Sequence, residues 1–163
     1  MPSVIVLMGV AGSGKTTIGK LLAEDLGWPF YEGDDFHPQA NVEKMNGGLP
    51  LNDEDREPWL HTLQKLINRL THSGESAILA CSALKRAYRE YLQRDNQGAL
   101  FVYLKGDYHL IRKRLEERKG HFMRAGMLES QFRTLEEPER ALVIDIFQEP
   151  EAVVDFIKRK LTL

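Results

Sequence analysis

The chain has 163 residues, a hydrophobic content of 42% and a formal net charge of −2. This length supports one well-cored domain, which we expect to span residues 1–163, and is too short for two ordinary domains. The slightly acidic balance disfavours nonspecific binding to nucleic acid or to a membrane surface, and no apolar run approaches the length of a membrane span. The N-terminal run lacks the basic segment and cleavage pattern of a signal peptide, so we expect a cytoplasmic protein.

Short apolar runs alternate with helical patterns from one end of the chain to the other. Five strands are predicted, at residues 4–8, 29–31, 77–81, 100–104 and 142–146. Five main helices are predicted, at residues 16–26, 57–72, 85–93, 108–119 and 150–161. This alternation is typical of an α/β fold with a parallel sheet whose two faces are covered by helices.

A glycine-rich segment lies between the first predicted strand and the first predicted helix. It fits the phosphate-loop pattern G-x-x-x-x-G-K-[ST] and reads Gly9, Val10, Ala11, Gly12, Ser13, Gly14, Lys15, Thr16. Glycines allow consecutive backbone N–H groups to point at a phosphate chain, and the helix N-terminus adds partial positive charge. Lys15 supplies a mobile positive charge, and the Thr16 hydroxyl can hold Mg²⁺. The segment predicts a site for ATP or another nucleoside triphosphate with Mg²⁺.

Two insertions interrupt the alternation, and function is expected to lie in them. The first spans about residues 34–55 and contains a short helical piece near 42–45. The second, a predicted lid at about residues 119–137, contains a short helix near 128–134.

Three acidic residues follow the second predicted strand. Since the ends of parallel strands share one edge of a sheet, these carboxylates are expected near the phosphate loop. Asp34 is predicted to orient an acceptor hydroxyl and take its proton, while Glu32 or Asp35 contacts the magnesium shell or caps the turn. The alternative is that they are solvated turn residues, which are common after a strand.

A basic cluster runs from the fourth main helix into the second insertion. Arg118 stands where helix meets lid and is predicted to stabilise charge on the transferring phosphoryl group. The alternatives are a solvated helix face paired with Glu116 and Glu117, or a nucleic-acid patch, which the acidic total disfavours. The other members are Arg112, Lys113, Arg114, Lys119, His121 and Arg124.

Positive charge and hydrogen-bond donors also gather around the first insertion and after the third strand. His37, Lys44, Arg56, Lys85 and Arg86 would suit a small anionic, hydroxyl-rich acceptor. No pattern in the residues identifies which acceptor it is.

Several blocks taken together resemble the gluconate kinase family, a group of phosphate-loop kinases related to shikimate and nucleoside monophosphate kinases. The blocks with the most specific patterns are G-D-x-x-H-P at residues 33–38, L-N-D-x-D-R-x-P-W at 51–59 and C-S-A-L-K at 81–85. The resemblance also includes R-K-G-H-F at 118–122 and Gln131-Phe132, and it covers nearly the whole chain.

The resemblance implies a nucleoside-monophosphate-kinase-like fold with strand order 2-3-1-4-5 and a cytoplasmic homodimer. It implies ATP-dependent phosphorylation of D-gluconate at its terminal hydroxyl to give 6-phosphogluconate. The segment from Gly9 to Thr17 would bind ATP and Mg²⁺, Asp34 would face the acceptor hydroxyl, and Arg118 would belong to the lid. The expected gluconate contacts are His37, Arg56 and Lys85.

Two other functions remain open from the sequence. One is a related small-molecule kinase of the shikimate or nucleotide type, because the fold is shared. The other is a nucleotide-binding module without catalysis, which the presence of Asp34 and the lid arginines disfavours.

Overall fold

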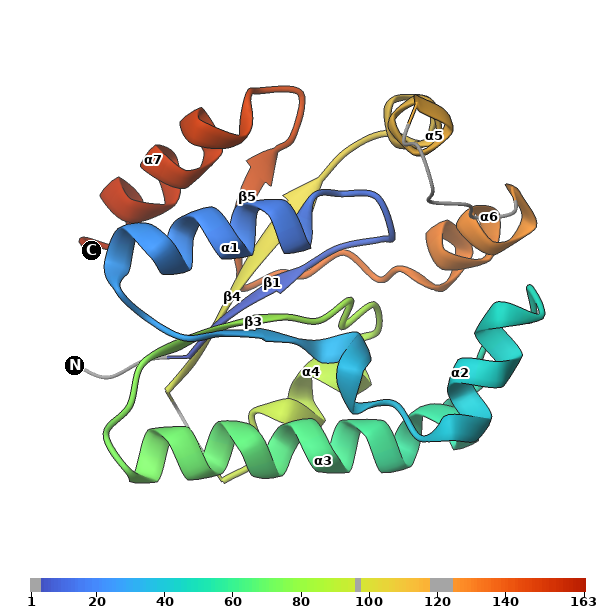
Figure 1. Cartoon of the computed structure of the whole chain (residues 1–163), viewed down its shortest axis with the longest axis horizontal. Coiled ribbons are helices and arrows are strands. Elements are labelled where there is room, and N and C mark those ends of the chain that lie inside the picture. Colours follow the sequence, from blue (N-terminus) through green and yellow to red (C-terminus); the bar gives the residue numbers. More distant parts are fainter. Residues whose placement is uncertain (1–3, 96–97, 118–124) are drawn as a thin grey trace.

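Five parallel strands form a central sheet in the order β2-β3-β1-β4-β5 (Figure 1). The computed structural model describes residues 4–95, 98–117 and 125–163. The strand order is the one that the family resemblance implied, and the α/β class is confirmed. The strands are β1 (Val4–Met8), β2 (Phe30–Glu32), β3 (Ala77–Ala80), β4 (Ala99–Lys105) and β5 (Leu142–Asp145).

Helices cover both faces of the sheet. Figure 1 shows α1 and α7 on one side and α3 and α4 on the other, with α2 and α6 beyond the carboxyl ends of the strands. The helices are α1 (Lys15–Leu26), α2 (Gln39–Asn46), α3 (Asp53–His72), α4 (Arg86–Leu92), α5 (Tyr108–Glu117), α6 (Ala125–Thr134) and α7 (Pro150–Lys160). A short 3-10 helix, η1 (Gly33–Phe36), follows β2 directly.

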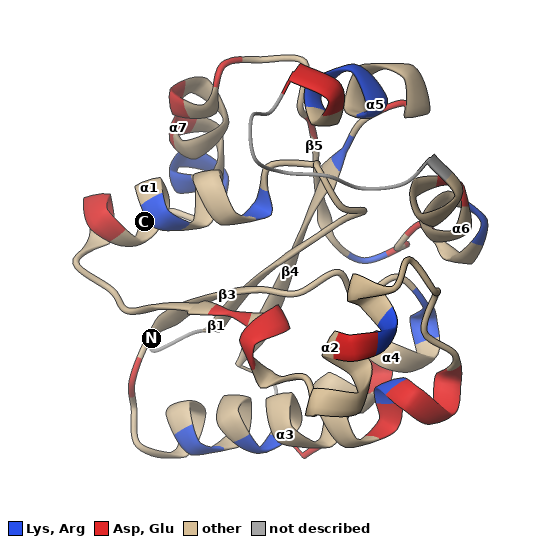
Figure 2. Ribbon diagram, turned by 45° about the vertical axis from the view of Figure 1, so that its right-hand side comes forward, with Lys and Arg blue, Asp and Glu red and all other residues tan. Residues whose placement is uncertain are grey.

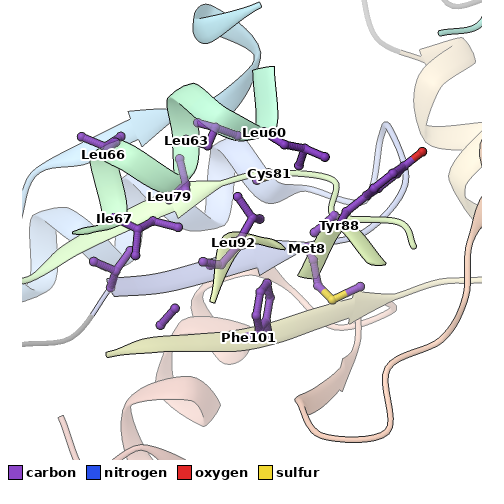
Figure 3. Packing of buried hydrophobic residues seen from close by; sticks show 14 of the residues in the cluster. Met8, Leu60, Leu63, Leu66, Ile67, Leu79, Cys81, Tyr88, Leu92 and Phe101 are labelled. Atoms are coloured by element: carbon purple, nitrogen blue, oxygen red, sulfur yellow. The ribbon is translucent and has the colours of Figure 1, made fainter. Parts of the chain in front are cut away.

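The central strand β1 is buried along its whole length, which explains why its sequence is continuously apolar. Ile5 and Leu7 pack towards α1 and α7, while Val6 and Met8 pack towards α3 and α4. Figure 3 shows the second of these clusters, in which side chains of α3 meet those of β3 and β4. Burial raises the pKa of the Cys81 thiol in this cluster to about 12, so this cysteine is a core residue that stays protonated. The buried strand β1 therefore fixes the start of the loop that follows it.

Helix α3 begins at Asp53, and the predicted start at residue 57 was wrong. The Asn52 side chain accepts a hydrogen bond from the Asp55 backbone, and the Asp55 carboxylate accepts one from the Asn52 backbone. This reciprocal cap satisfies two backbone donors of the first turn. Because the cap extends the helix, Arg56 lies on its first turn and not in a loop.

The remaining differences from the predicted elements are small. Strand β2 is displaced by one residue, and both short insertion helices are longer than predicted. Lys and Arg are interspersed with Asp and Glu on helices on both sides of the sheet (Figure 2). Within the described residues, no helix combines the length and apolar character needed to cross a membrane.

Candidate active site

The loop between β1 and α1 has the backbone geometry that its glycines predict. Gly12 and Gly14 have φ values of +79° and +95°, which are unfavourable for residues with a Cβ. A Cβ at Gly9 would come within 2.9 Å of the Leu104 carbonyl oxygen, so the loop also needs glycine there for close approach to β4. Glycine is therefore favoured at all three positions of this turn.

A buried polar atom marks the concave side of this loop. The Ser13 side chain is fully buried, and its Oγ has no hydrogen-bond partner among the described residues. An unsatisfied buried hydroxyl costs free energy unless a ligand supplies a partner. A hydroxyl beside the N-terminus of α1 suits phosphate oxygens, and the loop residues therefore fit the phosphates of ATP.

Lys15 reaches back across the loop. Its Nζ donates to the carbonyl oxygens of Gly9 and Val10, at 2.9 Å each. Desolvation lowers the pKa of the Lys15 ammonium, while the Asp34 carboxylate is the strongest nearby charge that opposes this shift. Lys15 and Asp34 therefore interact electrostatically. Their proximity was predicted from the sequence, because both follow strands that end at the same edge of the sheet.

Two oxygen-bearing side chains that could bind Mg²⁺ lie together at the start of α1. The Thr16 hydroxyl donates a short hydrogen bond to the Glu32 carboxylate at the end of β2. Burial raises the pKa of Glu32, and the hydrogen bond from Thr16 opposes that shift. Mg²⁺ prefers oxygen ligands and usually keeps several waters while using one or two protein groups plus substrate phosphates. Thr16 and Glu32 fit such a shell, whereas Asp35 is exposed and does not line the cavity described next.

A cavity of about 350 Å³ opens between the phosphate loop and the two insertions. Its walls come from the loop, the end of β2, helices α2, α3 and α6, and the segment after β3. Helices α2 and α6 lie near one another at the carboxyl ends of the strands (Figure 1). The predicted site residues that line it are Ala11, Gly12, Gly14, Lys15, Thr16, Glu32, Asp34, His37 and Arg56.

Asp34 projects from η1 with 71% of its side chain exposed, and it is therefore free to face a bound acceptor. His37 is almost fully buried behind it, with its Nε2 at 3.8 Å from Asp34 Oδ1. Arg56 approaches from the first turn of α3. One carboxylate and one guanidinium thus line the same cavity as the phosphate loop.

Lys85 is placed differently from the other predicted acceptor contacts. It is not among the described residues that line the cavity, and its Nζ forms an ion pair with Asp53 at 2.9 Å. The Tyr88 hydroxyl donates to the same carboxylate and accepts from Arg56 Nη1 at 2.9 Å. Figure 3 shows Tyr88 at the edge of the apolar cluster, with its hydroxyl directed away from the other labelled side chains. Tyr88 thus binds Arg56 directly, whereas Lys85 is linked to it only through the Asp53 carboxylate and Tyr88.

A second cavity of about 370 Å³ lies on the other side of the phosphate loop. It is bounded by Thr17 and Ser13, by the end of α5 and by the segment joining β5 to α7. Arg114, from the predicted basic cluster, lines this cavity and donates to the Ile146 carbonyl oxygen at 2.5 Å. Exposed Arg112 instead pairs with Glu116, as the alternative of a solvated helix face predicted.

Sequence reasoning missed one contact of the phosphate loop. Gln131 Oε1 on α6 accepts a hydrogen bond of 2.6 Å from the Ala11 backbone N–H. The Gln131-Phe132 block was noticed only as part of a resemblance, and no local pattern indicated its partner. Arg118, His121 and Arg124 lie outside the described residues, so their predicted lid roles stay predictions.

These features define a P-loop kinase: a parallel sheet in the order 2-3-1-4-5, a phosphate loop after β1, and an acceptor cavity with a carboxylate beside it. The shikimate kinase family profile matches residues 11–154. The chain belongs to the gluconokinase family within this class of kinases.

Three relatives illustrate the membership. The chain is 46% identical to a probable gluconokinase from Xenopus tropicalis, over 95% of this chain and 91% of the relative. It is 45% identical to the thermoresistant gluconokinase of Escherichia coli K12, over 93% and 89% of the two chains. The crystal structure of a gluconokinase from Sinorhizobium meliloti 1021 superposes with a TM-score of 0.86 at 38% identity, covering 99% of this chain and 96% of that one.

Proposed function

We propose that this protein is a gluconokinase that transfers the terminal phosphoryl group of ATP to the 6-hydroxyl of D-gluconate. The observation that carries the proposal is the single cavity that Lys15, Asp34 and Arg56 all line. The phosphate loop would bind the donor phosphates, the carboxylate would bind the acceptor hydroxyl, and the guanidinium would bind the acceptor carboxylate. The family membership supports the choice of gluconate.

The reaction follows from these roles. The gluconate hydroxyl oxygen forms a bond to the γ-phosphorus as the bond to the leaving ADP oxygen breaks, and the hydroxyl proton passes to Asp34. Lys15 and the loop N–H groups stabilise the negative charge on the phosphoryl oxygens. Thr16 and Glu32 would hold Mg²⁺, which would supply positive charge to neutralise the phosphates. Arg118 is proposed to add positive charge from the lid.

The remaining parts of the proposal concern the setting of the enzyme. We propose ATP with Mg²⁺ as the phosphoryl donor, D-gluconate as the small-molecule partner, and no nucleic acid or membrane partner. We further propose a cytoplasmic homodimer, which the family resemblance supports. Arg114 and Thr17, which line the second cavity, would lie near the nucleoside part of ATP.

An acceptor panel tests this function. Purified protein with Mg²⁺ and ATP is assayed for ADP release with gluconate, shikimate, nucleoside monophosphates and neutral sugars. We expect turnover with gluconate to exceed that with every other acceptor. Preference for shikimate or a nucleoside monophosphate would replace gluconate with that acceptor, and ATP binding without turnover on any of them would indicate a noncatalytic module.

Arg56 is expected to contribute gluconate affinity. Replacing it by glutamine removes a charge-assisted hydrogen bond, worth about 1.5–3 kcal/mol, so KM for gluconate should rise by about 10- to 100-fold. Since this interaction is present in both ground and transition states, kcat should change little. Steady-state kinetics measure both, with exposed Arg86→Gln as the matched control. An unchanged KM for gluconate would show that Arg56 does not bind the acceptor.

Glu32 is expected to contribute to metal use. Glu32→Gln keeps the shape and a hydrogen bond to Thr16 but removes a charged oxygen ligand, so the Mg²⁺ concentration for half-maximal rate should rise by about tenfold. A titration of the rate with Mg²⁺ at saturating ATP measures this. Asp35→Asn, an exposed neighbour, serves as the control. If Glu32→Gln had the same Mg²⁺ dependence as the wild type, Glu32 would stabilise the turn and would not bind the metal.

A further inference from the structure

His37 is held in one orientation by its neighbours. Its side chain is only 3% exposed, and its ring stacks on Trp59 with centroids 4.3 Å apart and planes 14° from parallel. Trp59 is itself anchored, because its indole N–H donates to the Gly33 carbonyl oxygen at 2.8 Å. The plane and direction of the imidazole are therefore set by the fold and not by solvent.

Asn41 determines which ring nitrogen of His37 carries the proton. The buried Asn41 side chain places one terminal atom 2.7 Å from the Asp55 carbonyl oxygen and 3.1 Å from His37 Nδ1. A carbonyl oxygen only accepts, so this atom is the amide nitrogen, and the orientation follows from the network. Nδ1 faces a donor and must accept. The neutral ring then carries its proton on Nε2.

That Nε2–H faces the predicted catalytic carboxylate. Nε2 lies 3.8 Å from Asp34 Oδ1, and the exposed Asp34 side chain can close this distance by rotation. The charged groups that act on His37 are Asp34 and Arg56. Burial lowers the pKa of His37, the Asp34 carboxylate opposes this, and Arg56 reinforces it, so the neutral ring is favoured at neutral pH.

We propose that His37 is a positioning residue whose Nε2–H, in the tautomer imposed by Asn41, orients the Asp34 carboxylate towards the acceptor hydroxyl. The proposal rests on the proposed role of Asp34 as proton acceptor. A neutral donor suits this task, because an imidazolium would stabilise the carboxylate anion further and weaken it as a base. It differs from the sequence expectation that His37 contacts gluconate directly.

The tautomer is tested by NMR without any assay. Protein labelled with ¹⁵N-histidine is examined at neutral pH by long-range proton–nitrogen correlation, and the His37 signals are assigned as those lost in His37→Gln. We expect a pyridine-like Nδ1 and a pyrrole-like Nε2. The opposite tautomer, or an imidazolium, would overturn the proposal whatever the substrate of the enzyme.

Kinetics test the positioning itself with a matched pair of variants. Glutamine can place an amide N–H where Nε2–H lies, whereas methionine has the same length and no donor. His37→Met should lower kcat by about 10²-fold, the effect of a misplaced catalytic group, and His37→Gln should recover most of that loss. The KM for gluconate should stay within about threefold in both variants. His72→Gln, at the exposed end of α3, is the control.

The outcomes separate this proposal from the proposed function. If the wild-type protein prefers another acceptor, the proposed function is wrong, and the kcat values of the His37 variants are then compared with that acceptor as the substrate. Equal losses of kcat in the glutamine and methionine variants would overturn the positioning role. A raised KM with unchanged kcat would instead make His37 a substrate contact.

Discussion

Replacing Lys15 by alanine is expected to lower kcat by about 10³-fold, the effect of removing a charged group that stabilises the transferring phosphoryl group. Within the described part of the chain, the hydrogen bonds of the Lys15 ammonium go to the backbone carbonyls of Gly9 and Val10 in its own loop, so the fold should tolerate the change. Single-turnover phosphoryl transfer measures the rate, and thermal unfolding measures the stability.

Lys20→Ala provides the matched control, because Lys20 lies on the exposed side of the same helix α1. Its rate and melting temperature should match those of the wild type. A Lys15→Ala protein that remained folded and kept its rate would show that the loop does not carry the chemistry assigned to it.

Replacing Asp34 by asparagine is expected to reduce kcat by about 10²- to 10⁴-fold, the range for a general base. The amide keeps the shape of the carboxylate and cannot take the hydroxyl proton. Binding of ATP should change far less, since the nucleotide is expected to be held by the phosphate loop and not by Asp34. Steady-state kinetics give kcat, and calorimetric titration with a nonhydrolysable ATP analogue gives the affinity.

Asp35→Asn is the natural comparison for this variant. Asp35 is the adjacent residue on η1, is exposed and does not line the acceptor cavity, so its kcat should remain close to that of the wild type. If the two variants lost activity equally, the electrostatic environment of the turn and not a specific base would be responsible.

The local parts of the site could be predicted from the sequence. The phosphate loop depends on glycines at defined spacing between a strand and a helix, and this pattern is visible without a fold. The position of Asp34 beside the loop followed from one topological rule, that parallel strands end at a common edge. In the structure Asp34 and Lys15 line the same cavity, as that rule requires.

The contacts that support the site could not be predicted in this way. Gln131 and Ala11 are 120 residues apart, and Lys85 and Asp53 are 32 residues apart, so neither pair leaves a periodic signal. Lys85 was expected to bind the acceptor because it is cationic, but it forms an ion pair with the Asp53 carboxylate instead. The predicted start of α3 at residue 57 was too late because the signal that begins the helix is the cap formed by Asn52 and Asp55.

A crystal structure with gluconate and a nonhydrolysable ATP analogue tests the central claim most directly. The measurement is the distance from the Asp34 carboxylate to the terminal hydroxyl of gluconate, together with the position of the γ-phosphorus. We expect a hydrogen bond between carboxylate and hydroxyl, with the hydroxyl oxygen about 3–3.5 Å from phosphorus. Asp34 turned towards bulk solvent, with another side chain holding the hydroxyl, would contradict this account.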